Sequence, residues 1–298
     1  MQLGVGLPYF PELPSDVYRN GTVDFVEVTP EILCRVRRDG TLDLLPDKLA
    51  RAKRVCEGLP IVVHGVDLSI GSAERCNAAY LELLDRFQAE WPFLWHSEHL
   101  GFQTIPSGHE HTLNTGVPLP LPATIEAVRL VAGRSAEIQR RYGVPFLLEN
   151  PAHYLPELPS DPDIGDDIGL MNTILERAGC LQLLDLHNLW CNAVNFGYDP
   201  RDAIRRMRLE RVGEIHIAGG SWQDGFWVDA HDGRVPAPVW DLLEFTLPRA
   251  PNVGGIVFEV LGEYLSRLGV DGIAGELARA RAIWRRCRLL QDAVSICH

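Results

Sequence analysis

Short apolar runs that each end in a polar residue recur along this chain, with helical patterns between them. Eight such runs occur, at residues 3–7, 24–29, 60–65, 93–98, 145–150, 181–188, 213–219 and 254–260. Continuous apolar runs of this length are typical of parallel strands that are buried on both faces. The pattern therefore predicts eight buried parallel strands.

The segments between these runs carry apolar residues at helical spacing. The clearest is 122–143, which begins with Pro122 and ends with Gly143, residue types that commonly start and stop helices. Further helices are expected at 73–90, 167–178, 199–210, 236–247 and 270–291. Eight strands alternating with helices predict an α/β fold, and the count favours a single closed (β/α)8 TIM barrel of the xylose-isomerase-like kind over an open sheet.

Two long segments, 100–121 and 151–166, are expected to be loops. Loops of this length are often lids or binding loops. His109 and His111 lie in the first loop and are expected to be solvated or to face a substrate. The sequence contains no internal repeat and no linker, so 1–298 is predicted to form one domain.

Composition excludes several classes of protein. The chain has 298 residues, of which 46% are hydrophobic, and a formal net charge of −12, which argues against nucleic-acid binding through phosphates. No run approaches 18 apolar residues, so no membrane helix is expected. The N-terminus lacks the features of a signal peptide, which makes the cytoplasm the default location. The seven scattered cysteines include no Cys-x-x-Cys and predict neither disulfides nor a Cys-rich zinc site.

Polar side chains that bind metals or transfer protons gather at the ends of the predicted strands. In a (β/α)8 barrel, the active site lies at these C-terminal ends. Seven of the eight ends offer such residues, which are Glu27, His64, His96, Glu98, His99, Glu149, Asp185, His187, Asn188, His216 and Glu259, and Asp229 and His231 follow the seventh strand. Imidazole with carboxylate suits iron, zinc or manganese, and several carboxylates can neutralise two or three cations. The pattern as a whole predicts a metal site.

Single residues of this set also have purely structural interpretations. His64 and His216 are each compatible with a buried core histidine, and Asp229 and His231 with loop residues. Glu149 follows three apolar residues, where an unpaired carboxylate is costly and calls for a cation. The joint pattern, more than any one residue, indicates the site.

The run 96-HSEH-99 leaves two alternatives open. Side chains alternate between the faces of a strand, so His96 shares a face with Glu98, whereas Ser97 shares the other face with His99. Alternation alone does not decide which face carries the ligand.

Several segments together resemble one family, the DUF692 family of multinuclear non-heme iron-dependent oxidative enzymes. They are 64-HGVDLSIGS-72, 97-SEHL-100, 114-NTGVPLPLP-122, 147-LLENP-151, 184-LDLHNLWCNAVNFGYDP-200, 214-EIHIAGG-220 and 229-DAHDGRVPAPVW-240. The resemblance runs from about Gly4 to Glu259. It implies a TIM barrel with two or three iron ions that uses O2 to modify cysteine residues of ribosomally synthesised precursor peptides, as in methanobactin and 3-thiaglutamate biosynthesis. It also implies a separate small partner protein that binds the leader peptide.

The resemblance further implies which residues act. Its metal ligands fall on His64, His99, Glu149, Asp185, Asn188, His216, Asp229, His231 and Glu259. Glu149 would bridge two irons, and Glu149, Asp185 and His187 are the expected catalytic residues. The motif Ser-Glu/Asp-His-Leu selects His99 as the ligand within HSEH, which leaves His96 as a packed residue and Glu98 as a supporting carboxylate.

This chain departs from the family pattern at two places. His187 stands where many members carry Asn, and Glu259 is followed by Val-Leu-Gly instead of an aromatic residue and Asp. These changes bear on substrate choice and local ligation. Glu27, Glu98 and His187 are the acid–base candidates near the metals.

Two other functions remain open. One is a Zn-, Mn- or Mg-dependent TIM-barrel isomerase or endonuclease-like hydrolase, of which the acidic net charge disfavours the nuclease. The other is a non-catalytic metal-binding subunit, which would have every coordination position closed.

Overall fold

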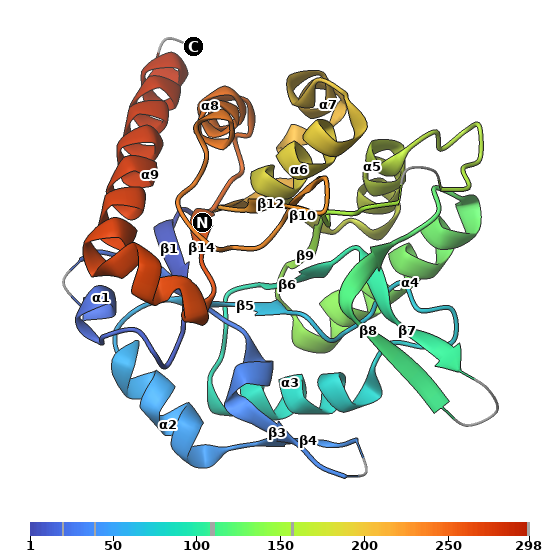
Figure 1. Ribbon diagram of the computed structural model, residues 1–298, viewed down its shortest axis with the longest axis horizontal. Helices are drawn as coiled ribbons and strands as arrows, with labels where there is room; N and C mark the ends of the chain where they lie inside the picture. Colours follow the sequence, from blue (N-terminus) through green and yellow to red (C-terminus); the bar gives the residue numbers. More distant parts are fainter. Residues whose placement is uncertain (20, 39, 108–110, 156–157, 297–298) are drawn as a thin grey trace. The chain divides into compact units, whose positions relative to one another are not determined.

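The eight predicted strands form a closed parallel barrel in the computed structural model, which describes residues 1–298 except 20, 39, 108–110, 156–157 and 297–298. The order around the barrel is β1-β14-β11-β10-β9-β6-β5-β2 (Figure 1). The strands are β1 (Gly4–Pro8), β2 (Phe25–Val28), β5 (Ile61–Gly65), β6 (His96–His99), β9 (Phe146–Glu149), β10 (Leu181–Asp185), β11 (Val212–Ala218) and β14 (Gly255–Glu259). The (β/α)8 fold is confirmed.

Two strand boundaries differ from the prediction by three residues, and the others by one residue at most. The fourth strand begins at His96 instead of residue 93. The sixth ends at Asp185, where helix α6 (Leu186–Phe196) starts at once. The Asp185 carboxylate accepts a hydrogen bond of 2.6 Å from the Asn188 backbone N–H, which satisfies a free donor of the first helical turn. His187 and Asn188 therefore lie on a helix and not on a strand.

The predicted helices are present, the one at 167–178 with the predicted bounds and the others with shifted ends. The helices other than α6 are α1 (Asp16–Arg19), α2 (Pro46–Val55), α3 (Ala78–Glu90), α4 (Ile125–Tyr142), α5 (Asp167–Ala178), α7 (Pro200–Arg206), α8 (Ala237–Thr246) and α9 (Leu265–Ile296). The helix expected from 73 begins at Ala78, because the Asn77 side chain caps it by accepting from the Tyr80 N–H. Helix α9 is interrupted at Gly269, whose φ of 68° is not helical.

The predicted loop at 100–121 is instead largely an antiparallel hairpin of β7 (Gly101–Ser107) and β8 (His111–Pro120). Alternating Thr and apolar residues, with Thr104 opposite Asn114 and Ile105 opposite Leu113, suit a paired ribbon. His109 and the side chain of His111 lie outside the described residues. The other hairpins are β3 (Cys34–Val36) with β4 (Leu42–Leu44) and β12 (Ser221–Gln223) with β13 (Phe226–Val228).

The chain divides into two compact units. The first unit comprises 1–27, 55–60 and 183–298, and the second comprises 28–54 and 61–182. None of the helices in the described parts of the chain has the length and apolarity needed to cross a bilayer.

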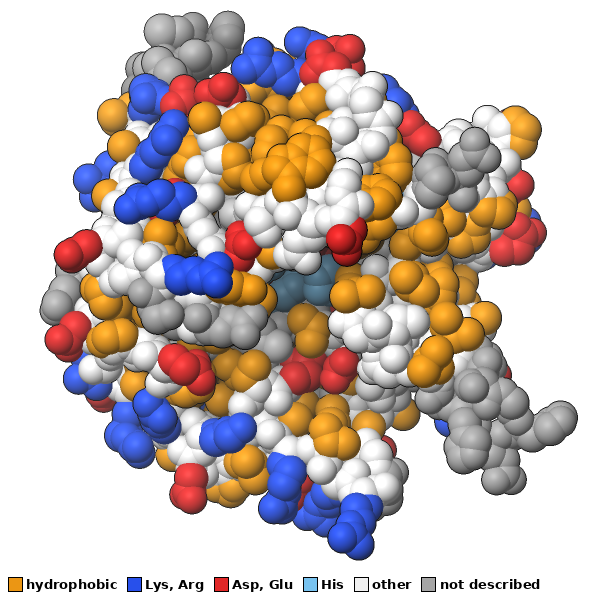
Figure 2. Space-filling view, viewed as in Figure 1, with side chains coloured by type: hydrophobic (Ala, Val, Ile, Leu, Met, Phe, Trp, Pro, Cys, Tyr) orange, Lys and Arg blue, Asp and Glu red, His pale blue; other side chains and the backbone are white. Residues whose placement is uncertain are grey.

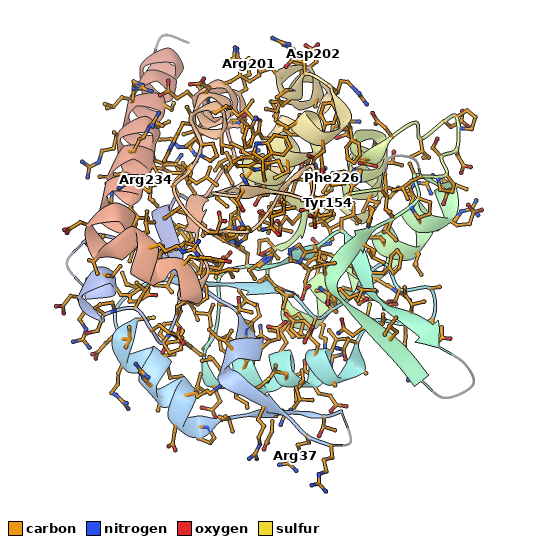
Figure 3. All side chains as sticks on the ribbon, viewed as in Figure 1. Arg37, Tyr154, Arg201, Asp202, Phe226 and Arg234 are labelled. Carbon is orange, nitrogen blue, oxygen red and sulfur yellow. The ribbon has the colours of Figure 1, made fainter. Side chains whose placement is uncertain are left out.

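Ion pairs hold helix α9 within the first unit. Arg281 contacts Asp24 at 3.0 Å, and Glu276 accepts from the Arg234 guanidinium at 2.9 Å (Figure 3). Glu276 also accepts from the Val235 N–H. The segment that follows Asp229 and His231 is thereby fastened to α9.

Candidate metal centre

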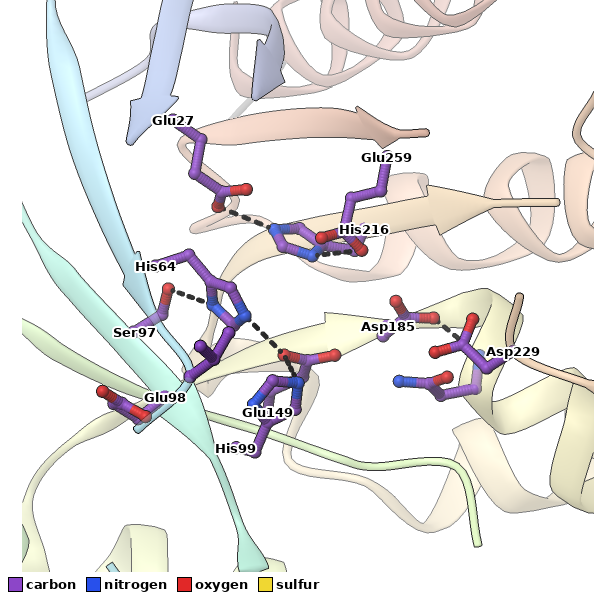
Figure 4. A network of polar contacts seen from close by, with 12 residues as sticks. Glu27, His64, Ser97, Glu98, His99, Glu149, Asp185, His216, Asp229 and Glu259 are labelled. Carbon is purple, nitrogen blue, oxygen red and sulfur yellow. Dashed lines mark hydrogen bonds and ion pairs between the residues drawn. The ribbon is translucent and has the colours of Figure 1, made fainter. Parts of the chain in front are cut away.

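The ends of three neighbouring strands of the second unit place two histidines around one buried carboxylate (Figure 4). Oε2 of Glu149, at the end of β9, lies 3.4 Å from Nε2 of His64 on β5 and 3.4 Å from Nε2 of His99 on β6. Ligand atoms of these three residues all lie within 4.8 Å of one another. We call this group the His64 cluster.

Ser97 determines which nitrogen of His64 faces Glu149. The Ser97 hydroxyl donates its one hydrogen to the Val63 carbonyl at 3.2 Å. It must therefore accept from Nδ1–H of His64, which lies 3.0 Å away. When His64 is neutral, Nε2 therefore carries the lone pair on the side of Glu149, which is the state that binds a metal.

His96 and Glu98 point to the other face of β6. Nε2 of His96 lies 3.1 Å from the Tyr80 hydroxyl and 3.5 Å from Glu98. Burial lowers the pKa of His96 to about 3 and raises that of Glu98 well above its usual value. A Cβ on Gly65 would come within about 2 Å of Tyr80 and Glu98, so these groups fill the space beside a glycine. The two faces predicted from strand alternation are therefore separate environments.

Glu31 is a further buried carboxylate of the second unit, and it makes stability depend on pH. It accepts from the backbone N–H groups of Val66 at 2.8 Å and Asp67 at 3.0 Å. Burial nevertheless raises its pKa to about 7. A raised carboxyl pKa stabilises the fold fully below the unfolded value near 4.5, and this contribution is lost as pH rises through 7.

Glu31→Gln is therefore expected to be more stable than the parent at pH 8 by about 3 kcal/mol, and near-equal at pH 4.5. Urea unfolding of both proteins across this range measures the difference. Glu57→Gln, which changes an exposed carboxylate, is the control and should leave the pH profile unchanged. Parallel pH profiles for Glu31→Gln and the parent would show that Glu31 is ionised without penalty.

The first unit holds a second arrangement, in which one histidine lies between two carboxylates. Nε2 of His216, on β11, lies 3.0 Å from Glu27 on β2, and Nδ1 lies 2.9 Å from Glu259 on β14 (Figure 4). Ligand atoms of the three lie within 4.8 Å of one another, and His216 is fully buried. Burial acts to lower the pKa of His216, but the two carboxylates raise it well above its usual value. We call this group the His216 cluster.

Asp229 joins two more histidines of the first unit. Its Oδ1 lies 2.8 Å from Nδ1 of His187 and 2.9 Å from Nε2 of His231. Although burial opposes it, Asp229 and Glu259 raise the pKa of His231 to about 10. His231 also lies 3.8 Å from Glu259, so these residues extend the His216 cluster.

Asp185 and Asn188 are both buried in the first unit. Burial first, and then the charges of Asp229 and Glu259, raise the pKa of Asp185 to about 7. A carboxyl group with this pKa is matched to proton transfer near neutral pH.

The nine predicted ligands thus divide by unit. His64, His99 and Glu149 meet in the second, and Asp185, Asn188, His216, Asp229, His231 and Glu259 lie in the first. Sequence reasoning assigned Glu27 only an acid–base role and gave none to Ser97 or Trp227. Glu27 ends an apolar run like the other ligands, which was an available signal, whereas the contacts of Ser97 and Trp227 come only from the fold.

The donor set suits a hard or borderline transition metal. Both clusters combine imidazole nitrogen with carboxylate oxygen and contain no thiolate, as iron, zinc and manganese sites do. Buried carboxylates such as Glu149 and Glu27 require a positive charge nearby. On the face seen in Figure 2, Lys and Arg side chains alternate with acidic ones, and its described residues form no continuous basic surface.

The fold and these clusters define a TIM-barrel protein with histidine and carboxylate groups suited to metals at its strand ends. The chain belongs to the family of RiPP precursor modification enzymes MbnB/TglH/ChrH, whose model matches residues 4–284. This confirms the resemblance found in the motifs.

Similar proteins include a UPF0276 protein of Anaeromyxobacter, 33% identical over 70% of this chain and 71% of the relative. Another, from Pasteurella multocida, is 30% identical over 87% of this chain and 88% of its own. Among solved structures, a putative xylose isomerase from Rhodospirillum rubrum aligns with TM-score 0.55 and 16% identity over 95% and 99% of the two chains. Endonuclease IV from Thermus thermophilus aligns with a TM-score of 0.51 and 16% identity, over 96% of this chain and 100% of its own. These structures support the xylose-isomerase-like barrel alone.

Proposed function

We propose that this protein is a cytoplasmic, iron- and O2-dependent oxidase that modifies cysteine residues of a ribosomally synthesised precursor peptide. Membership of the precursor modification family supports a peptide substrate. The observation that carries the iron assignment is the pair of buried clusters, each of which offers imidazole and carboxylate atoms within 4.8 Å of one another. The nine predicted ligands, with Glu27 added, would hold two or three ions.

The chain's own residues prepare these sites before substrate arrives. Ser97 selects the tautomer of neutral His64 in which Nε2 is free of hydrogen, and the Glu149 carboxylate lies between two imidazoles. We assign Glu149 the bridging role. Burial of Glu149 and His64, 2% and 5% exposed, keeps bulk water from the reacting groups.

Bound iron supplies a Lewis acid that lowers the pKa of a substrate thiol and a centre that reduces O2. We assign Asp185 to the ligands that hold iron; in the metal-free protein burial raises its pKa to about 7, so binding a cation there would displace its proton. A separate leader-peptide-binding protein would deliver the peptide.

The function is tested by purifying the protein anaerobically, measuring metals, and adding O2 and the precursor peptide encoded beside the gene. We expect two or more irons per chain and an O2-dependent change of peptide mass. A peptide with cysteine replaced by serine is the control and should remain unmodified. Stoichiometric zinc, with no peptide modification after iron reconstitution, would favour the isomerase or hydrolase alternative and reject the proposal.

A further inference from the structure

We propose that Trp227 is a positioning residue, which acts through His187 to orient the Asp229 carboxylate toward the metal-binding groups of the first unit. The inference deepens the proposed function and rests on it only in taking Asp229 as part of a metal site. It gives a role to the histidine at which this chain departs from the family motif. Trp227 itself would touch neither metal nor substrate.

The hydrogen bonds determine the tautomer of His187. An indole N–H is only a donor, and Nε1 of Trp227 lies 3.1 Å from Nε2 of His187. Nε2 must therefore carry the lone pair. The remaining hydrogen of a neutral imidazole is then on Nδ1, which lies 2.8 Å from the acceptor Oδ1 of Asp229.

Both nitrogens of His187 are thus occupied, and the side chain is fully buried. A ring in this state lacks a free nitrogen for a metal and an exposed one for a substrate. The geometry favours an orienting role over the acid–base role predicted from the sequence. Oδ1 of Asp229 is hydrogen-bonded to His187 and lies 2.9 Å from Nε2 of His231 in an ion pair, and these two contacts restrict rotation of its carboxylate.

Hydrogen bonds and ring packing fix the position of Trp227, so that its indole can orient His187. Its backbone N–H donates to the Asn195 side chain at 2.8 Å, and its carbonyl accepts from the same amide at 2.9 Å. Its ring packs edge-on against Trp190, with centroids 4.7 Å apart, and against Trp222 at 5.8 Å. Asn195 and Trp190 both belong to α6, the helix that carries His187.

The hairpin of β12 and β13, which carries Trp227, is preceded by a residue that lies close to His187. A Cβ on Gly220 would lie 2.8 Å from the His187 ring and 2.2 Å from the Val228 carbonyl, so only glycine fits there. Elsewhere the hairpin is open, with Trp222 61% and Phe226 38% exposed. Only Trp227, of these three aromatic residues, donates a hydrogen bond to the imidazole in the described structure.

The first measurement uses the metal-free parent protein. Nitrogen-15 NMR of labelled histidine, with the His187 signals identified by their loss in His187→Asn, should show hydrogen on Nδ1 and none on Nε2. A protonated Nε2 would overturn the proposal. Because this readout needs neither iron nor peptide, it separates the inference from the proposed function, which fails independently if the iron-loaded enzyme does not modify peptide.

The second measurement removes only the donor. Trp227→Phe keeps an aromatic ring but not the N–H, and we expect Fe(II) affinity to fall about 10–100-fold, as when groups that orient ligands are lost. Trp222→Phe, on the same hairpin, is the matched control and should bind Fe(II) as the parent does. Affinity is measured anaerobically by competition with a chromophoric chelator.

A double-mutant cycle tests the route through His187. If Trp227 acts through that imidazole, Trp227→Phe should change Fe(II) affinity little further in a His187→Asn background. Equal losses in both backgrounds would overturn the route. Parent-like affinity of folded Trp227→Phe would overturn the role itself.

Discussion

Glu149→Ala is expected to lose at least one bound iron per chain and to lower peptide modification by about 100-fold or more, given that loss of groups that merely support ligands already costs 10–100-fold. The physical reason is that Glu149 supplies the only carboxylate of the His64 cluster. Without it, His64 and His99 offer two neutral nitrogens and no charge to offset a buried cation. Metal analysis and single-turnover peptide assays measure the two effects.

The matched control is Glu98→Gln. Glu98 is as buried as Glu149, at 1% against 2% exposed, but it contacts His96 and lies on the opposite face of β6 from Ser97 and His99. Its replacement should leave the iron content unchanged. If Glu149→Ala retained iron and activity, the bridging role of Glu149 would be wrong. If both variants lost iron equally, a general disturbance of β6 and β9 would explain the loss.

The barrel was predictable because burial on both faces leaves a direct mark on the sequence. A barrel strand that is buried on both faces is largely apolar, and on β9 and β10 the charged residues Glu149 and Asp185 stand at the strand end. The eight apolar runs therefore predicted the strands, and the polar residues at the ends of these runs predicted most of the candidate site.

The remaining features depend on contacts between distant residues. Asp185 resembles a strand-end ligand in the sequence, yet it also caps α6 and places His187 on a helix. Ser97 and Trp227 are ordinary residues until the fold brings them 3.0 and 3.1 Å from imidazole nitrogens. The hairpin at 101–120 was missed because its alternation mixes Thr, Gly and Pro with few apolar residues.

His216→Leu is expected to destabilise the metal-free protein by about 3–5 kcal/mol, which is typical of removing one partner of a buried ion pair. In the parent, a protonated His216 lies between Glu27 and Glu259 at 3.0 and 2.9 Å. The variant leaves two buried carboxylates without that cation. Urea unfolding in the presence of chelator measures the loss.

The stability lost in His216→Leu is expected to depend on pH, in the direction set by the pKa of His216. The raised pKa of His216 makes its stabilisation fully present below the unfolded value near 6.5 and lost only as pH rises through the higher folded value. Burial also raises the pKa of Glu27, although the nearby His216 acts to lower it. The free energy of unfolding of His216→Leu should therefore fall as pH rises above about 4.5, because carboxylates ionise more readily in the unfolded chain than in the buried, unpaired site.

Two further variants separate the loss of charge pairing from the loss of packing. His153→Leu removes a histidine whose partner Asp167 is 57% exposed, and such pairs contribute about 0–1 kcal/mol. Adding Glu27→Gln and Glu259→Gln to His216→Leu should recover part of the stability, since neutral amides remove the buried charge. If the triple variant were no more stable than His216→Leu alone at pH 7, lost packing of the imidazole, and not unpaired charge, would account for the effect.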